Sequence, residues 1–152
     1  MGKILILYAS TTGNTEIMAD VIADTFEADG YEVNIKTFDF DWIEVEELSD
    51  YNAILIGTHT WDDGSLPYEV EDFYDELEEA DITNQPFAVF GSADSFYPTY
   101  GGAVDLIGDR VVELGGQLYP ERLKVDMYPD KKDIHNCQAF AKGFEKMLRE
   151  NE

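Results

Sequence analysis

Short apolar runs alternate with longer segments of helical periodicity along this chain, and no other feature constrains its fold more. Residues 3–8 and 53–57 are almost uninterrupted apolar runs, as expected for strands buried on both faces of a sheet. Further strands are predicted at residues 32–38, 87–91 and 116–125, the last of them irregular because a proline lies within it.

The segments between these strands place apolar residues at helical spacing. Helices are predicted over residues 15–29, 68–79, 103–114 and 133–148. Gly30 follows the first of them as a stop signal. The acidic segment 39–50 carries Trp42, Val45 and Leu48, which we expect to pin a short helix to the body.

Strands that alternate with helices predict a doubly wound α/β fold, in which helices cover both faces of a five-stranded parallel sheet. The chain has 152 residues, which is close to the usual size of about 150 residues for one domain. We therefore expect residues 1–152 to form a single domain. In such folds a ligand binds beyond the carboxyl ends of the strands, which directs attention to loops 9–14, 58–67 and 92–101.

The charge and the cysteine content exclude several classes of function. Ten basic and 33 acidic residues give a net charge of −23, which argues against nucleic acid and anionic lipid as partners. The single cysteine, Cys137, leaves no internal disulfide and no cysteine-based zinc site, and no metal is expected. No run reaches the roughly 20 apolar residues of a membrane span, and no signal-peptide pattern is visible. We expect an acidic, cytoplasmic, monomeric protein.

The loop after the first strand is rich in groups that bind an anion. It reads Ser10-Thr11-Thr12-Gly13-Asn14-Thr15 and leads directly into a predicted helix. A glycine lets backbone N–H groups converge on an anion, and the start of a helix adds unpaired donors and partial positive charge. The alternative is a helix cap, which needs only one such residue. Five capping residues in six positions favour a phosphate site built without lysine or arginine.

The pattern around this loop narrows the class of phosphate ligand. The sequence has no Gly-Lys pair for a P-loop and no Gly-x-Gly-x-x-Gly for a dinucleotide. Cys137 lies far away in the last predicted helix, which excludes a cysteine-based phosphatase loop, and the first strand does not end in the acidic residues of a receiver domain. A mononucleotide held by neutral donors remains.

Two further loops carry aromatic residues that can face a planar ring. The loop after the third strand places Trp61 among turn residues, and the loop after the fourth strand carries Tyr97. An aromatic side chain from each loop can enclose a ring between them. For Trp61 taken alone, a partly buried loop anchor is the alternative.

With these three loops the sequence resembles the flavodoxins, in particular the short-chain group that lacks an inserted segment in the last strand. The resemblance runs from residue 3 to about residue 148. Residues 10–15 match the family's Thr-x-Thr-Gly-x-Thr loop, with serine first. Residues 57–67 match its strand-three motif, except that Asp62 stands where glycine is common. Residues 90–97 match its Phe-Gly-x-x-Asp-x-x-Tyr motif.

The resemblance implies a strand order of 2-1-3-4-5, non-covalently bound FMN and three groups of residues around it. The FMN phosphate would be held by Ser10, Thr11, Thr12, Gly13, Asn14 and Thr15. One side of the isoalloxazine would be lined by Thr58, His59, Thr60, Trp61 and Asp62. The other side would be lined by Ser92, Ala93, Asp94 and Tyr97, with Tyr100 near the ring.

The sequence assigns no definite role to either of the two histidines. His59 is either a pH sensor beside the flavin or an exposed loop residue, and His135 is expected on the surface.

The function implied is that of a low-potential one-electron carrier that meets a basic flavodoxin reductase and other redox enzymes. No catalytic residue is expected, since FMN carries the chemistry. An FMN-dependent NAD(P)H or quinone reductase is one alternative, although the chain has no extra segments and its charge repels NADPH. A binding module that has lost FMN is another alternative, which the intact loops oppose.

Overall fold

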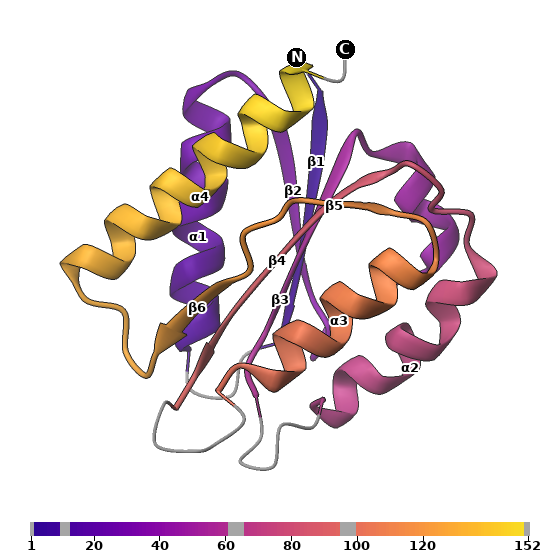
Figure 1. The fold of residues 1–152 in the computed structure, drawn as a ribbon, viewed down its shortest axis with the longest axis horizontal. Helices are drawn as coiled ribbons and strands as arrows, with labels where there is room; N and C mark the ends of the chain where they lie inside the picture. The colour runs from indigo at the N-terminus through magenta and orange to yellow at the C-terminus, as the bar shows by residue number, and fades with distance from the viewer. Residues whose placement is uncertain (1, 10–12, 61–65, 95–99, 151–152) are drawn as a thin grey trace.

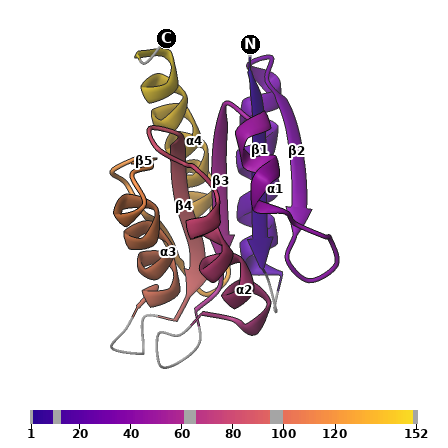
Figure 2. The same ribbon diagram turned by 90° about the vertical axis from the view of Figure 1, so that its right-hand side faces the viewer.

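The computed structural model describes residues 2–9, 13–60, 66–94 and 100–150, which form a sheet between two layers of helices (Figures 1 and 2). In chain order the elements are β1 (Lys3–Ala9), α1 (Asn14–Ala28), β2 (Glu32–Thr37), the 3₁₀ helix η1 (Val45–Asp50), β3 (Ala53–Thr58), α2 (Tyr68–Glu76), the 3₁₀ helix η2 (Leu77–Glu79), β4 (Pro86–Ala93), α3 (Gly102–Glu113), β5 (Gln117–Leu118), β6 (Leu123–Asp126) and α4 (Lys131–Glu150).

The sheet is parallel throughout its described pairs and has the order β2-β1-β3-β4-β5, which confirms the predicted topology. The order reverses between β1 and β3, because the chain first adds β2 on one side of β1 and then returns to the other side. This reversal is the point at which doubly wound sheets bind ligands.

Alternate residues of each central strand face different helical layers. In β1, Ile4 and Ile6 pack with α1 and α4 in one core, whereas Leu5 and Leu7 pack with η1, α2 and α3 in the other. Figure 2 shows the two layers on opposite faces of the sheet. Both faces of β1 and β3 are therefore buried, which explains why their sequences are almost wholly apolar.

The fifth position of the sheet is occupied by two short strands instead of one. Both β5 and β6 pair with β4, and the exposed Pro120 lies between them. Proline has no N–H for the ladder, so the predicted irregularity of this strand is confirmed.

The segment between β2 and β3 differs in one respect from the short, pinned helix that the sequence predicts. Val45 and Leu48 are buried and hold η1 against the body, as predicted. Trp42 does not pin this segment, because 81% of it is exposed to solvent. Its indole N–H donates to Glu44 at 3.1 Å, which satisfies the polar atom without burying the ring.

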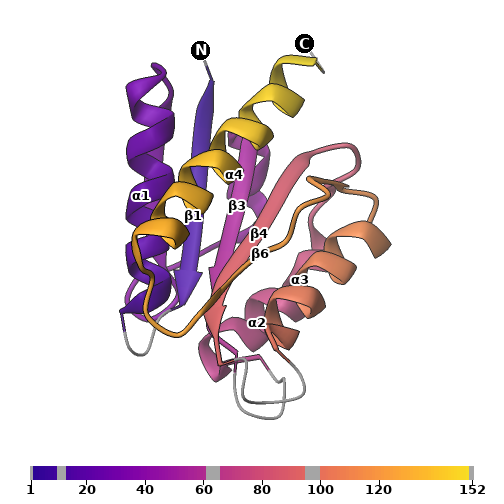
Figure 3. The same cartoon turned by 60° about the vertical axis from the view of Figure 1, so that its left-hand side comes forward.

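The central strands β1, β3 and β4 run in the same direction and end at one edge of the molecule, where α1 and α3 begin (Figure 3). Within the described residues, no helix combines the length and the apolar character that a membrane crossing requires.

Candidate functional site

The carboxyl edge of the central strands brings together ten of the sixteen residues predicted to bind the cofactor. The described ones are Gly13, Asn14, Thr15, Thr58, His59, Thr60, Ser92, Ala93, Asp94 and Tyr100. They come from segments up to 87 positions apart in the sequence, and the parallel register places Ala9 at the end of β1 opposite Thr58 at the end of β3. The other six, Ser10, Thr11, Thr12, Trp61, Asp62 and Tyr97, lie outside the described residues.

Gly13 starts α1 in a left-handed conformation, with φ of 88° and ψ of −6°. A residue with a Cβ adopts this conformation only with strain, which explains the glycine. A Cβ placed there would meet no atom within 4 Å, so the space beside the helix start is open. As the residue that begins the helix, Gly13 supplies no side-chain cap of its own.

A pair of buried hydroxyls connects the first loop to the end of β4. The Oγ1 atom of Thr15 lies 2.8 Å from the Oγ atom of Ser92, and the backbone N–H of Ser92 also points to Thr15 Oγ1 at 3.4 Å. Thr15 is completely buried and Ser92 almost so. The two predicted halves of the site, one at the phosphate and one at the ring, are thereby fixed to each other.

His59 is held at the end of β3 by the neighbouring strand. Its Nδ1 atom lies 3.3 Å from the carbonyl oxygen of Ala9, and its side chain is half-buried. The alternative of an exposed loop histidine is therefore wrong for this structure. The preceding Thr58 is buried and donates its hydroxyl to the His59 carbonyl at 2.9 Å. His135, in contrast, is exposed on α4 as predicted.

Thr60 links the second loop to the start of α3. The backbone N–H of Ala103 donates to Thr60 Oγ1 at 3.2 Å. Gly101, which starts α3 in the left-handed region with φ of 68°, has no side chain to supply this cap. A hydroxyl predicted to face the cofactor thus also accepts a bond from a backbone N–H in the first turn of α3.

Gly91 allows β3 and β4 to approach closely just below the site. A Cβ at this position would lie 1.9 Å from the carbonyl oxygen of Thr58 and 2.7 Å from Cγ2 of Val104. The glycine of the Phe-Gly motif is therefore needed for space, so that Thr58 and Ser92 can reach the same edge.

The electrostatics of this edge are dominated by carboxylates. Burial, followed by the negative charges of Asp126 and Asp133, raises the pKa of Tyr100 above its usual range. Burial and a hydrogen bond to Glu16 raise the pKa of Tyr8 to about 12, with the Tyr8 hydroxyl donating to Glu16 at 2.8 Å. Sequence reasoning missed this pair, although a carboxylate in the first turn of a helix is a common signal.

The described residues fit a cofactor that bears a phosphate. Backbone N–H groups point out of the start of α1, and the space beside Gly13 is open. Neutral hydroxyls of threonine and serine from the start of α1 and the ends of β3 and β4 lie at the same edge. This donor set suits an anion bound by a helix start better than it suits a metal ion.

Comparisons with known proteins agree with this geometry. Residues 6–140 match the sequence model of the flavodoxin family. Probable flavodoxin 1 of Bacillus subtilis is 41% identical over 145 residues, which are 95% of this chain and 90% of the relative. The flavodoxin of Maridesulfovibrio salexigens is 36% identical over 138 residues, covering 88% of this chain and 92% of the relative.

The fold of a solved relative is also close. The crystal structure of oxidised flavodoxin 1 from Bacillus cereus is 40% identical, has a TM-score of 0.91, and covers 95% of this chain and 97% of its own. Motifs, strand order, site geometry and relatives point to the same conclusion. The chain belongs to the flavodoxins, the family of FMN-binding electron carriers that the three loop motifs indicate.

Proposed function

We propose that this protein, acting as a single-domain monomer in the cytoplasm, carries one electron at a time between a basic flavodoxin reductase and acceptor redox enzymes. Residues 10–15 would hold the FMN phosphate, and the residues of the second and third loops would line the ring. The net charge of −23 supports a basic partner, because opposite charges steer encounters between proteins.

Each part of the site has a separate task in this proposal. Bound FMN supplies the redox chemistry, which is the exchange of single electrons. The backbone of residues 13–15 would bind the phosphate, and Thr15 would keep that loop in place through Ser92. Trp61 and Tyr97 would lie against the ring and exclude water from it. The acidic surface makes added negative charge at the site less favourable, which lowers the potential.

The observation that carries the proposal is the start of α1, which combines a left-handed glycine with open space beside it. A helix that starts in this way at the switch point of a doubly wound sheet is suited to an anion. The surrounding hydroxyls extend the same chemistry along the edge.

The first test is the variant Thr12→Ala, which removes one hydroxyl from the proposed phosphate loop. A hydrogen bond to a charged group contributes about 1.5–3 kcal/mol, so FMN affinity should fall about tenfold or more. Riboflavin lacks the phosphate, and its affinity should stay almost unchanged. Fluorescence titration with both ligands measures this difference, with Thr83→Ala in the turn before β4, away from the carboxyl edge of the sheet, as a control.

Equal losses for FMN and riboflavin would show that residues 10–15 are not the phosphate site. The carrier function has its own test, since the FMN-loaded protein should not oxidise NADPH until a reductase is added. Rapid oxidation by the protein alone would favour a reductase.

A further inference from the structure

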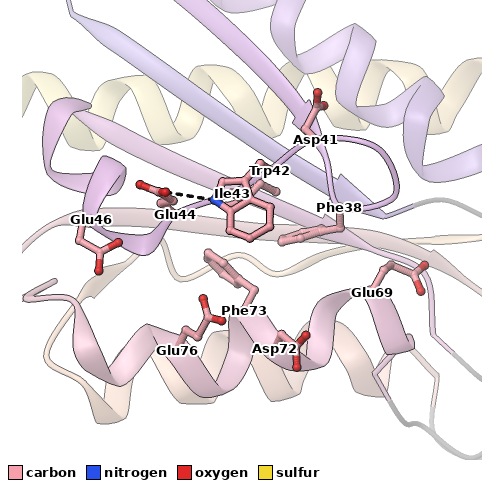
Figure 4. Close-up of a pocket in the computed structure, with 10 residues that line it drawn as sticks. All are labelled: Phe38, Asp41, Trp42, Ile43, Glu44, Glu46, Glu69, Asp72, Phe73 and Glu76. Atoms are coloured by element: carbon pink, nitrogen blue, oxygen red, sulfur yellow. Dashed lines mark hydrogen bonds between the residues drawn. The ribbon is translucent and has the colours of Figure 1, made fainter.

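A groove of about 420 Å³ lies between the segment after β2 and the outer face of α2 (Figure 4). Its floor is apolar, because the ring of Phe38 packs on the ring of Phe73 with their centroids 5.2 Å apart. Ile43 adds to this floor. The groove is separate from the residues assigned above to the phosphate and the ring.

Trp42 stands in this groove as the largest exposed ring among the residues that line it. It is 81% exposed, although burial of a tryptophan normally stabilises a fold. Its indole nitrogen is satisfied by Glu44 at 3.1 Å, which fixes the ring while leaving it open to solvent. A fixed, exposed tryptophan offers its face to a cation.

Both walls of the groove are acidic. Glu69, Asp72 and Glu76 follow one side of α2 at helical spacing, and Asp41, Glu44 and Glu46 lie on the other wall. None of the ten described residues that line the groove is lysine, arginine or histidine. The neighbouring Lys36 is already paired with Glu47 at 2.8 Å. Within the described residues, the lining of the groove therefore supplies no positive charge of its own to these carboxylates.

The chemistry of the groove identifies one kind of occupant. Among the described residues, no group of acidic or histidine side chains is arranged to hold a metal ion. A second copy of the chain would bring another net charge of −23. A guanidinium group can both stack on an indole and form paired hydrogen bonds with carboxylates, which the ammonium of lysine does less well.

We propose that this groove docks an arginine-bearing segment of a redox partner, with an arginine side chain against Trp42 and its neighbours along the acidic wall of α2. The proposal rests on the function proposed above, which requires a basic partner. The groove also adjoins the cofactor edge, because the N–H of Phe38 donates to the carbonyl of Tyr8 at 2.9 Å and α2 starts directly after the second loop. A partner held here would therefore lie alongside the site.

The probe for this proposal is a hexa-arginine peptide, titrated into the FMN-loaded protein and compared with hexa-lysine. The indole N–H signal of Trp42, assigned with Trp42→Phe, should shift to saturation in two-dimensional NMR spectra. Hexa-arginine should bind more tightly than hexa-lysine. The variant Trp42→Ala should weaken hexa-arginine binding about two- to fivefold and hexa-lysine binding less, since the loss is that of an exposed cation–π contact.

Two matched variants separate the groove from the general charge of the protein. The groove variant is Glu69→Gln/Asp72→Asn/Glu76→Gln, and the control variant is Asp20→Asn/Asp24→Asn/Glu27→Gln on α1, outside the groove. Both remove three negative charges. The groove variant should weaken hexa-arginine binding about tenfold, from three exposed ion pairs, and the control variant much less.

Equal weakening by the two triple variants, or a Trp42 signal that hexa-arginine leaves unmoved, would overturn the docking proposal. The same would follow if millimolar MgCl₂ saturated the Trp42 shift, because the groove would then be a cation site. Flavin absorbance of each variant reports the cofactor site independently. A parent protein that takes up no FMN would count against the proposed function, whereas equal hexa-arginine binding by the two triple variants, with FMN bound to both, would count against the groove alone.

Discussion

At the scale of single residues, Gly91 is where one added methyl group should disturb the site most. The variant Gly91→Ala places a Cβ within 1.9 Å of the Thr58 carbonyl, and both atoms belong to buried strands that cannot move aside freely. We expect a loss of about 1–3 kcal/mol in unfolding free energy, as for other overpacked cores, together with weaker FMN binding.

The comparison for this prediction is Gly13→Ala. Its Cβ meets nothing within 4 Å, so only the strain of a positive φ is added, about 1–2 kcal/mol. Urea unfolding of both variants without FMN measures the two costs. A Gly91→Ala protein as stable as the parent would show that β3 and β4 can separate at this point.

The hydroxyl pair of Thr15 and Ser92 makes a second prediction at this scale. Ser92→Ala leaves the buried Thr15 hydroxyl without its side-chain partner, which should cost about 1 kcal/mol of stability. Thr25→Ala is a suitable control, because the Thr25 hydroxyl donates within its own helix α1, to the carbonyl of Val21. Chemical denaturation compares the two, and a larger loss in the control would contradict a structural role for the pair.

Single residues also mark the limit of what the sequence predicts. Thr15 and Ser92 are 77 positions apart, and each was expected to face the cofactor on its own. Their mutual bond depends on the packing of α1 against β4, which no local pattern contains. The contact of His59 with the Ala9 carbonyl has the same origin, since it crosses from β3 to β1.

At the scale of elements, periodicity predicted most helices and strands because each has one or two faces in the core. It failed at Trp42, since an aromatic residue near buried Val45 and Leu48 gives the same apolar pattern whether its ring packs inward or outward. It was right about the break near Pro120, because the missing N–H is a local property. That any of the sixteen site residues binds the cofactor stays a prediction, and six of them lie outside the described ranges.

The contact between α1 and α4 contains a buried carboxylate that predicts a pH effect. Glu145 is 4% exposed, its Oε2 atom has no hydrogen-bond partner within the described residues, and Arg149 pairs with its other oxygen. Burial, with the nearby Asp29 carboxylate, raises the pKa of Glu145 above its ordinary value of 4.5. The folded state therefore holds this proton more tightly than the unfolded state.

Stability from this group is present below pH 4.5 and is lost as the pH rises through the raised pKa of the folded state. Glu145→Gln removes the titration, so its melting temperature should match that of the parent at low pH. At pH 7 it should melt at a higher temperature than the parent, because the parent then holds Glu145 ionised at a buried position. Thermal unfolding across the pH range measures the difference, and a variant that is less stable at pH 7 would contradict the sign.

At the scale of the whole molecule, the net charge of −23 should control how fast partners are found. Association with a basic reductase should slow steeply between about 0.01 M and 0.15 M salt, as the Debye length falls from about 30 Å to about 8 Å. Stopped-flow reduction over this series, at fixed reductase concentration, measures the effect. A rate that stays flat or rises would show that docking depends on something other than charge.

The exposed segment between β5 and β6 is a position at which the fold should tolerate inserted residues. Pro120 and Glu121 are exposed between β5 and β6, and both strands pair with β4 alone. Additional residues there would lengthen a surface loop, whose entropic cost grows only with the logarithm of its length. The three loops of the cofactor edge are carried by other connections, so a reporter peptide or a whole second protein could be grafted at this point while electron transfer continues.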